Sequence, residues 1–402
     1  MKITKVEIFD CDVNMVDPNQ NKLPFNPILL RLHTDEGITG VGEAGLAYGK
    51  SSKAAVGQLR DFAPLILGRD PMQVESIWED LFRGTFWGMS GGPVVYSGMS
   101  AIDIACWDIR GKVLNAPIYQ LLGGKTNDNL RCYASQIQFD WDLNYRGLAT
   151  PEEYAQAARK ALDDGYDAVK VDPIMLDRNA GRPSRGGVKH SYFGLLTHDE
   201  LDMATCRVAA IREEVGPAVD IIIEIHANLG VNSAIQLGRA LETYGIYYYE
   251  EPVHPMNVDN MALVAKKTNL PIATGERSYT RWGYRAMFEK QALAVIQPDL
   301  CLVGGITEGK KVCDYANIYD ATVQIHICGA PVSTAAALHV EAVIPNFIIH
   351  EHHTNALKEC VRELCIHDYQ PENGKYKVPD RPGLGQELND AVVKNYLVHT
   401  FE

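Results

Sequence analysis

The sequence lacks the cysteine pattern of a disulfide-bonded or thiolate-metal protein. Its nine cysteines are an odd number, they are scattered, and none forms a Cys-x-x-Cys pair. Cys360 and Cys365 are the closest two, and nothing around them marks a metal site. Secreted domains pair their cysteines, whereas reduced core thiols are usual in the cytosol. We therefore expect a cytoplasmic protein with reduced cysteines.

Signals for membranes and nucleic acids are missing as well. No uncharged apolar run approaches the roughly 18 residues of a spanning helix. Glu7 and Asp10 stand where a signal peptide would be apolar. The formal net charge of −13 argues against nucleic acid or an anionic membrane as a partner. It does not exclude a small anionic substrate, because a bound cation can invert the local field.

The chain has 402 residues, which is long enough for one large barrel plus a further domain. Its composition is that of an ordinary globular protein. Residues 1–125 show strands followed by helices without alternation, which predicts an α+β domain. The expected strands are 3–9, 27–32 and 38–43, and the expected helices are 51–66, 72–85 and 95–114. Small residues in the last of these helices, such as Ala101 and Ala105, indicate close packing, and we interpret this helix as structural.

From about residue 126 the pattern changes to strand, loop and helix, repeated to residue 353. The expected strands are 130–136, 167–172, 219–225, 246–250, 271–274, 293–297, 322–326 and 346–350. The expected helices are 151–164, 199–215, 231–244, 258–267, 280–290, 305–319 and 332–343. Eight strands separated by seven helices predict a closed parallel barrel, with its chemistry at the carboxyl ends of the strands. Residues 354–402 lack this rhythm, and we expect them to pack back on the first domain.

Three carboxylates follow short apolar runs within the predicted barrel. Residues 224, 250 and 276 are all glutamate, and each is 26 positions from the next. That interval suits one strand, loop and helix, so the three acids would lie at one height on adjacent strands. Carboxylate oxygens are the ligands that Mg²⁺ prefers. The alternative is that they are ordinary solvated loop acids, but their equal register favours a metal site.

Candidate acids and bases follow other predicted strands. His226 is two residues beyond Glu224, so alternation would direct both side chains to one face, although a lone histidine is more often structural. Asp299 and His326 end consecutive strands, where an aspartate can orient an imidazole and raise its basicity as a general base requires. Glu351 ends the eighth strand, and Lys170 and Asp172 end the second.

These parts predict chemistry at a carbon next to a carboxylate. A metal held by three carboxylates can bind a substrate carboxylate, and a base can then remove the α-proton. The metal stabilises the resulting enediolate. His326 and His226 lie on opposite walls of the predicted barrel, which suits a base on one side of the substrate and an acid that expels a β-hydroxyl on the other.

Three loops are candidates for covering this site. Residues 173–197 form a connection of roughly 25 residues, a length that is usually functional or disordered. We interpret it as a substrate lid, with a mobile surface loop as the alternative. In the first domain, loops 19–25 and 46–50 are expected to close the pocket. They carry few charges apart from Lys22 and Lys50, which suits a polyol tail better than a second carboxylate.

At this point the sequence resembles the mandelate racemase subgroup of the enolase superfamily over essentially its whole length. The motifs are Ala101-x-Asp-x-Ala-x-Trp-Asp-x-x-Gly-Lys112 with Leu121-Leu-Gly-Gly124, Glu250-Glu251-Pro252, Thr274-Gly275-Glu276 and Gly304-Gly-Ile-Thr-Glu308. The resemblance implies a modified TIM barrel, (β/α)₇β, beneath an N-terminal α+β capping domain that the C-terminal tail completes. It also implies one Mg²⁺ ion and a homo-oligomer. Superfamily sites pair a lysine or histidine base with Mg²⁺.

Within the subgroup, the pattern is similar to acid-sugar dehydratases of the galactonate type, which implies a role for each candidate. The metal ligands match Glu224, Glu250 and Glu276. His326 matches the base, Asp299 its support and His226 the acid, while Glu351 matches a group that hydrogen-bonds the substrate carboxylate or the enediolate. The candidate substrate-binding residues are Lys170, Asp172 and Asn228.

Some residues depart from the family pattern. The first metal ligand is more often aspartate than glutamate, which puts the identity of the substrate in doubt. Racemases usually carry Lys-x-Lys on the second strand, and Asp172 in place of the second lysine favours a one-base dehydratase. Glu251 could replace Glu250 as a ligand, but only Glu250 keeps the register.

The expected function is therefore dehydration of an aldonate-like sugar acid to a 2-keto-3-deoxy acid, which makes the chain a hydro-lyase. The alternatives are an epimerase, racemase or cycloisomerase on the same scaffold, and a non-catalytic binding or regulatory protein.

Overall fold

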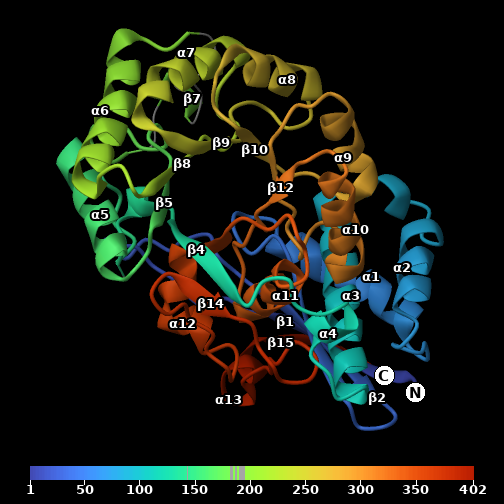
Figure 1. Ribbon diagram of the computed structural model, residues 1–402. Helices are drawn as coiled ribbons and strands as arrows, with labels where there is room; N and C mark the ends of the chain where they lie inside the picture. Colours follow the sequence, from blue (N-terminus) through green and yellow to red (C-terminus); the bar gives the residue numbers. More distant parts are fainter. Residues whose placement is uncertain (143, 182–183, 186–187, 190–194) are drawn as a thin grey trace.

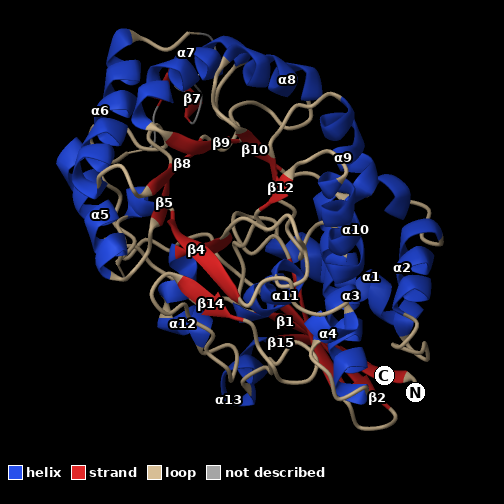
Figure 2. Cartoon of the chain, viewed as in Figure 1, coloured by secondary structure: helices blue, strands red, loops and turns tan. Residues whose placement is uncertain are grey.

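A computed structural model describes residues 1–142, 144–181, 184–185, 188–189 and 195–402 (Figure 1). A ring of strands lies inside a ring of helices, and an antiparallel sheet with further helices flanks one side of this barrel (Figure 2). The predicted fold class, a modified TIM barrel with an N-terminal α+β capping domain, is confirmed. No helix among the described residues is long and apolar enough to cross a membrane.

The barrel sheet is parallel, in the order β12-β11-β10-β9-β8-β5-β4-β13. Its strands are β4 (Asn129–Ser135), β5 (Ala168–Val171), β8 (Asp220–Glu224), β9 (Ile246–Glu250), β10 (Ile272–Thr274), β11 (Val295–Ile296), β12 (Thr322–Val323) and β13 (His350–His353). The helices outside them are α5 (Pro151–Asp163), α6 (His198–Val215), α7 (Val231–Leu241), α8 (Val258–Lys267), α9 (Thr280–Glu289), α10 (Gly305–Asn317) and α11 (Pro331–Glu341). Strands covered on both faces explain continuous apolar runs such as Ile221-Ile222-Ile223, all fully buried.

The eighth strand differs from its predicted range. Residues 346–348 pair with β12 through Val323 and close the ring, but β13 begins only at His350, where it pairs with β4. The predicted strand 346–350 therefore covered the residues that pair with β12. It missed most of the residues that pair with β4, because the polar sequence His350–His353 gave no apolar strand signal.

The capping domain consists of an antiparallel sheet with helices packed on it. Its sheet has the order β15-β1-β2-β3, from β15 (Leu397–Phe401), β1 (Ile3–Asp10), β2 (Ile28–Thr34) and β3 (Thr39–Ala44). Its helices are α1 (Ser52–Ile66), α2 (Val74–Arg83) and α3 (Gly92–Val113). The pairing of β15 with β1 brings the two chain ends side by side in Figure 1. The shorter elements are α4 (Ile118–Leu121), β6 (Ser184–Arg185), β7 (Val188–Lys189), α12 (Glu359–Arg362), β14 (Lys375–Lys377) and α13 (Asp390–Val393).

The C-terminal segment packs on both parts of the molecule. β15 extends the sheet of the capping domain, as expected, but β14 pairs antiparallel with the barrel strand β4. The segment therefore ties the capping domain to the barrel instead of covering only the former. The exact domain boundaries at 125 and 353 stay a prediction.

Helix α3 packs closely against β3, and the fit requires glycine on the strand. A Cβ on Gly42 would lie 1.9 Å from the Ala101 carbonyl oxygen, and one on Gly40 would lie 2.2 Å from that of Ala105. Neither contact is physically possible, so small residues on both elements set this distance. The interpretation of α3 as a close-packed structural helix agrees with this geometry.

The same helix also holds the capping domain on the barrel. Ser100 Oγ accepts hydrogen bonds from the backbone N–H groups of Gly304 and Gly305, both at 3.0 Å. Asp103 Oδ2 accepts one from the Thr307 N–H at 3.0 Å. These side chains satisfy the free N–H groups at the start of α10, as a helix cap does, but from another domain.

We expect Ser100→Ala to destabilise the protein because it leaves the N–H groups of Gly304 and Gly305 buried without a partner. The free energy of unfolding should fall by about 1–3 kcal/mol, measured by chemical denaturation. Ser97→Ala is a matched control, because Ser97 is equally buried on α3 but donates only to Val94 of its own helix. Equal stability of the two variants would contradict this account of the cap.

Candidate active site

The barrel interior has layers that explain which side chains reach the site. One layer contains a single apolar residue from each of six strands and one from the position just before β13: Tyr133, Ala168, Ile222, Tyr248, Ala273, Val295 and Ile349. Because side chains alternate along a strand, residues two positions further on point inward one layer nearer the carboxyl ends. That next layer includes Lys170, Glu224, Glu250, Gln297 and Glu351, all at most 1% exposed. The apolar layer is thus the floor beneath a polar one.

The three predicted metal ligands come together at this end of the barrel. Glu224 and Glu250 are direct partners in the pairing of β8 with β9, and Glu276 follows β10. Glu224, Glu250 and Glu276 each offer one carboxylate oxygen within 4.8 Å of the others. Gly275 allows the close turn before Glu276, since a Cβ there would lie 2.6 Å from the Gln297 backbone nitrogen.

The electrostatics of this cluster fit a cation. Burial, opposed only in part by Lys170, raises the pKa of Glu224 to about 7. Burial and the adjacent Glu224 hold the pKa of Glu250 well above its usual range. Glu276 is the exception: burial opposes its ionisation, but the charges of His326 and Arg277 lower its pKa to about 2. A set of buried carboxylate oxygens that repel one another suits a hard divalent ion such as Mg²⁺.

Lys170 lies within the acidic layer, between three carboxylates. Its Nζ is 3.0 Å from Glu250 Oε1, 2.8 Å from Glu351 Oε1 and 3.6 Å from Glu224 Oε2. The side chain is 1% exposed, and the ion pairs raise its pKa well above the usual value although burial opposes this. Its charge is paired with the acids of this layer, and a contact between Lys170 and a substrate stays a prediction.

His326 and Asp299 form the expected pair. His326 Nδ1 lies 2.8 Å from Asp299 Oδ2, and Nε2 lies 3.0 Å from Glu276 Oε2. Burial lowers the pKa of His326, but Glu276 and the hydrogen bond with Asp299 outweigh it and raise the pKa to about 10. Asp299 therefore fixes the ring so that Nε2 points to the acid cluster and the cavity.

Glu351 is buried on β13 with both oxygens occupied. Oε1 accepts from Ser135 Oγ at 2.7 Å, and Oε2 accepts from the Ile327 N–H at 3.0 Å. Burial opposes ionisation, but Lys170 and His326 hold its pKa well below the usual range. Glu351 is thus a fixed negative charge beside His326 and Lys170.

His226 reaches the site from the end of β8, but not by strand alternation. β8 ends at Glu224, and His226 and Ala227 have φ angles of 50° and 57°, in the left-handed region. The alternation argument was therefore wrong, although it chose a residue that lines the cavity. His226 Nδ1 lies 2.7 Å from Asp172 Oδ2, so His226 has an aspartate partner as His326 does.

The other two predicted substrate-binding residues, Asp172 and Asn228, are paired within the protein, and their contact with a substrate stays a prediction. Asp172 is fully buried, and its oxygens accept from His226 and from the Ile174 N–H at 3.0 Å. Asn228 donates to the Ile225 carbonyl at 3.1 Å, and it is not among the described residues that line the cavity.

The cavity lies between the barrel and the capping domain and has a volume of about 320 Å³. Barrel residues in its wall include His226, Glu276, Asp299 and His326, while the capping domain supplies residues 45–48 and Pro93. The predicted closing loop 46–50 thus borders the cavity. Residues 23–25 of the other predicted loop line a neighbouring cavity of about 260 Å³, which shares Tyr48 with the first.

The predicted lid at 173–197 is described only in part. Leu176 and Ala180 line the neighbouring cavity that loop 19–25 borders. Residues 182–183, 186–187 and 190–194 lie outside the described residues, so closure over a substrate stays a prediction.

Sequence reasoning missed several side chains around the cavity. Arg277 Nη1 lies 2.9 Å from Glu251 Oε2, and Nη2 lies 3.1 Å from Glu276 Oε1. Glu251, the alternative ligand, is therefore held by Arg277. Glu43 on β3 is fully buried and accepts from the N–H groups of Ala330 and Ser333 at the start of α11. Two signals in the sequence could have identified these side chains. Arg277 directly follows the predicted ligand Glu276, and Glu43 is an acid at the end of a predicted strand of the capping domain.

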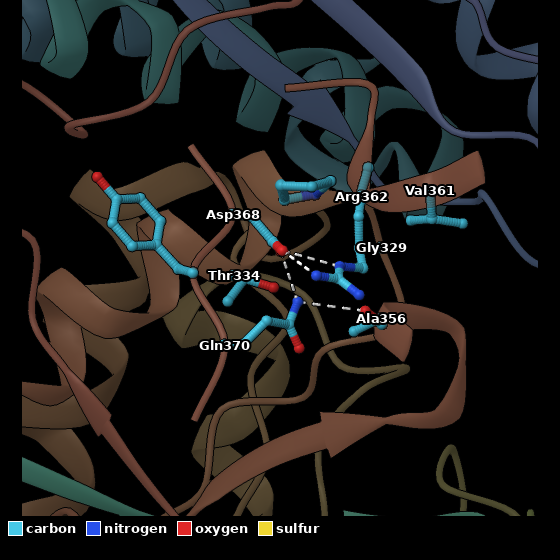
Figure 3. A pocket seen from close by; sticks show the side chains of 10 residues that line it. Gly329, Thr334, Ala356, Val361, Arg362, Asp368 and Gln370 are labelled. Carbon is cyan, nitrogen blue, oxygen red and sulfur yellow. Dashed lines mark hydrogen bonds and ion pairs between the residues drawn. The ribbon is translucent and has the colours of Figure 1, made fainter. Parts of the chain in front are cut away.

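A second pocket near this site is too small for a substrate. It lies between the start of α11 and the C-terminal segment, where Asp368 joins Arg362 to Gln370 and Gln370 donates to the Ala356 carbonyl (Figure 3). Its volume of about 10 Å³ has room for at most one water molecule. The larger cavity is therefore the candidate for a small-molecule substrate.

The fold and the site define a class: a modified β/α barrel beneath an α+β cap, with acids and histidines at the strand ends. Residues 153–392 match the enolase C-terminal domain-like family, and residues 19–123 match the N-terminal domain of mandelate racemase and muconate lactonizing enzyme. The chain therefore belongs to the mandelate racemase and muconate lactonizing enzyme family of the enolase superfamily.

Several of the proteins that this chain resembles are named dehydratases, and one similar structure, at 27% identity, is a 3,6-anhydro-D-galactonate cycloisomerase of Zobellia galactanivorans. The chain is 34% identical to D-xylonate dehydratase of Haloferax volcanii over 98% of this chain and 90% of that protein. It is 33% identical to D-galactonate dehydratase of Ralstonia nicotianae over 92% of this chain and 91% of that protein. A crystal structure from Salmonella enterica serovar Typhimurium, described provisionally as a dehydratase, is 62% identical with a TM-score of 0.96 and full coverage of both chains. The prediction of an enzyme is confirmed.

Proposed function

We propose that this chain dehydrates a monocarboxylic sugar acid, an aldonate, to a 2-keto-3-deoxy acid. The observation that carries the proposal is the pair of histidines in one cavity, each backed by an aspartate. His326 is held by Asp299 and His226 by Asp172, and the carboxylate cluster lies beside them. Dehydration next to a carboxylate needs one group to take a proton and another to give one.

The proposed metal ligands are Glu224, Glu250 and Glu276, whose oxygen atoms suit one Mg²⁺ ion. When bound, the ion supplies positive charge that attracts the substrate carboxylate and favours the negative charge developing on it. Lys170 and Arg277 flank the acids from two sides and keep them in place before any cation arrives. Glu351 keeps Lys170 in position within the polar layer.

His326 is the proposed base in its neutral form, because a cation held by Glu276 would neutralise the charge that contributes most to its raised pKa. Its Nε2 faces the acid cluster and lies 3.0 Å from Glu276 Oε2. A substrate whose own carboxylate is bound at this cluster would therefore present its C2–H bond to this nitrogen. Nε2 takes the proton, and the electron pair of the C2–H bond moves toward the carboxylate. Asp299 accepts a hydrogen bond from Nδ1–H and stabilises the positive charge that the ring then carries.

His226 is the proposed acid. Asp172 fixes its Nδ1, so Nε2 is the nitrogen that would give a proton to the 3-hydroxyl group as the C3–O bond breaks and water leaves. A double bond forms between C2 and C3, and the resulting enol becomes the 2-keto-3-deoxy acid. Gln136 Nε2 lies 3.5 Å from His226 Nε2 and limits the rotation of the ring.

An aldonate is the favoured substrate for two reasons. The dehydratases named above act on D-xylonate and D-galactonate, which have one carboxylate each. The one basic side chain among the described residues of the cavity wall, apart from histidine, is Arg277, and it is paired with Glu251 and Glu276. A second substrate carboxylate would thus lack a free cation there. The cytoplasmic location and homo-oligomeric state stay predictions.

A panel of aldonic and aldaric acids tests the proposal. Purified protein with Mg²⁺ should form a keto acid from at least one aldonate, detected with semicarbazide. EDTA should abolish the reaction and Mg²⁺ should restore it. Consumption or epimerisation of an acid without keto product would contradict dehydration and favour an isomerase. No conversion and no binding of any acid would favour a non-catalytic protein.

A further inference from the structure

Most polar side chains in the cavity wall are already occupied by protein partners. His226 and His326 contact aspartates, Arg277 contacts Glu251 and Glu276, and Glu43 caps α11. Tyr279 is different, because its hydroxyl group has no hydrogen-bond partner in the described part of the chain, although it lines the cavity. A polar group on a cavity wall without a partner is available to a ligand.

The backbone around Tyr279 is strained. Thr280, the next residue, has a φ of 56°, which is unfavourable for a β-branched residue, and it is almost fully buried. Its N–H donates to the Val303 carbonyl at 3.2 Å, which helps to hold this conformation. Residues kept in such conformations by their surroundings cluster at functional sites.

The ring of Tyr279 is also fixed by packing. It contacts Tyr96 of α3 with ring centroids 5.8 Å apart, so it is held between the barrel and the capping domain. Burial, together with the nearby charge of Glu276, raises the pKa of Tyr279 to about 12. The hydroxyl group therefore stays protonated and can donate as well as accept a hydrogen bond.

We propose that Tyr279 determines specificity by hydrogen-bonding a hydroxyl group on the sugar-acid chain beyond C3. The inference rests on the proposed function, because it needs a sugar acid in this cavity. Carbons 1 to 3 have their own partners there: the acid cluster and its cation for the carboxylate, His326 for C2 and His226 for the 3-hydroxyl group. Tyr279 belongs to the wall shared with the capping domain, which the rest of the chain would contact.

The test compares wild-type protein with Tyr279→Phe, which removes only the hydroxyl group. The probes are the panel aldonate that wild-type protein binds with the lowest calorimetric Kd and its deoxy analogues at each carbon beyond C3. We expect KM and the calorimetric Kd for the parent acid to rise about tenfold, with kcat changed by less than about threefold. For one deoxy analogue, wild type and variant should bind equally, because the partner hydroxyl is already absent.

Tyr96→Phe is the matched control. Tyr96 belongs to the same ring pair, but it is 4% exposed and is not among the described residues that line the cavity. It should leave KM unchanged. Unchanged KM and Kd in Tyr279→Phe, or an equal penalty for the parent and every deoxy analogue, would overturn the proposal. Wild-type binding without turnover would contradict the proposed function but leave the Kd comparison valid, and no binding at all would overturn both.

Discussion

Glu250→Gln should abolish tight Mg²⁺ binding and reduce turnover at least about a thousandfold. Glutamine keeps the shape of the side chain but removes one negative charge from the centre of the cluster. It also leaves Lys170, 3.0 Å away, with one acid fewer to neutralise it. Isothermal titration with Mg²⁺ measures the first effect, and the semicarbazide assay measures the second.

Two further variants make this test specific to Glu250. Glu251→Gln changes the adjacent residue, which pairs with Arg277 and not with the cluster, so Mg²⁺ binding should persist. Glu213→Gln makes the same charge change on the exposed surface of α6 and should have no effect on either measurement. Loss of Mg²⁺ binding in Glu251→Gln with retention in Glu250→Gln would show that the ligand was wrongly assigned.

His326→Asn should stop removal of the α-proton. The asparagine amide can still reach toward Asp299, but it is no base, so turnover should fall about 10²–10⁴-fold. Loss of C2-proton exchange with D₂O, followed by NMR, would place the defect at proton removal. His198→Asn, at an exposed position on α6, is the control. Exchange at the wild-type rate in His326→Asn would contradict its assignment as the base.

The equal spacing of three glutamates could predict the acid cluster because a parallel barrel repeats its geometry with each strand and helix. Glu224 and Glu250 are indeed paired residues on adjacent strands. The same regularity predicted Asp299 beside His326, at 2.8 Å. Where the chain is regular, sequence spacing translates directly into position in space.

Prediction failed where regularity ends or where tertiary contacts decide. His226 lies in a left-handed turn, so strand alternation says nothing about its direction. The pairing of Lys170 with Glu250 and of Asp172 with His226 could not be predicted, because each pair joins distant segments of the chain. The docking of Ser100 on α10 could not be predicted either, because it joins residues about 200 positions apart.

The most direct test of the account is the separation of the two histidine roles. His226→Asn should still exchange the C2 proton of the active aldonate with D₂O, while formation of the 2-keto-3-deoxy product falls at least about a hundredfold. The same NMR sample reports both, since deuterium incorporation and product appear as separate signals. Dehydration at the wild-type rate in His226→Asn, or loss of exchange together with dehydration, would contradict the division between His326 as base and His226 as acid.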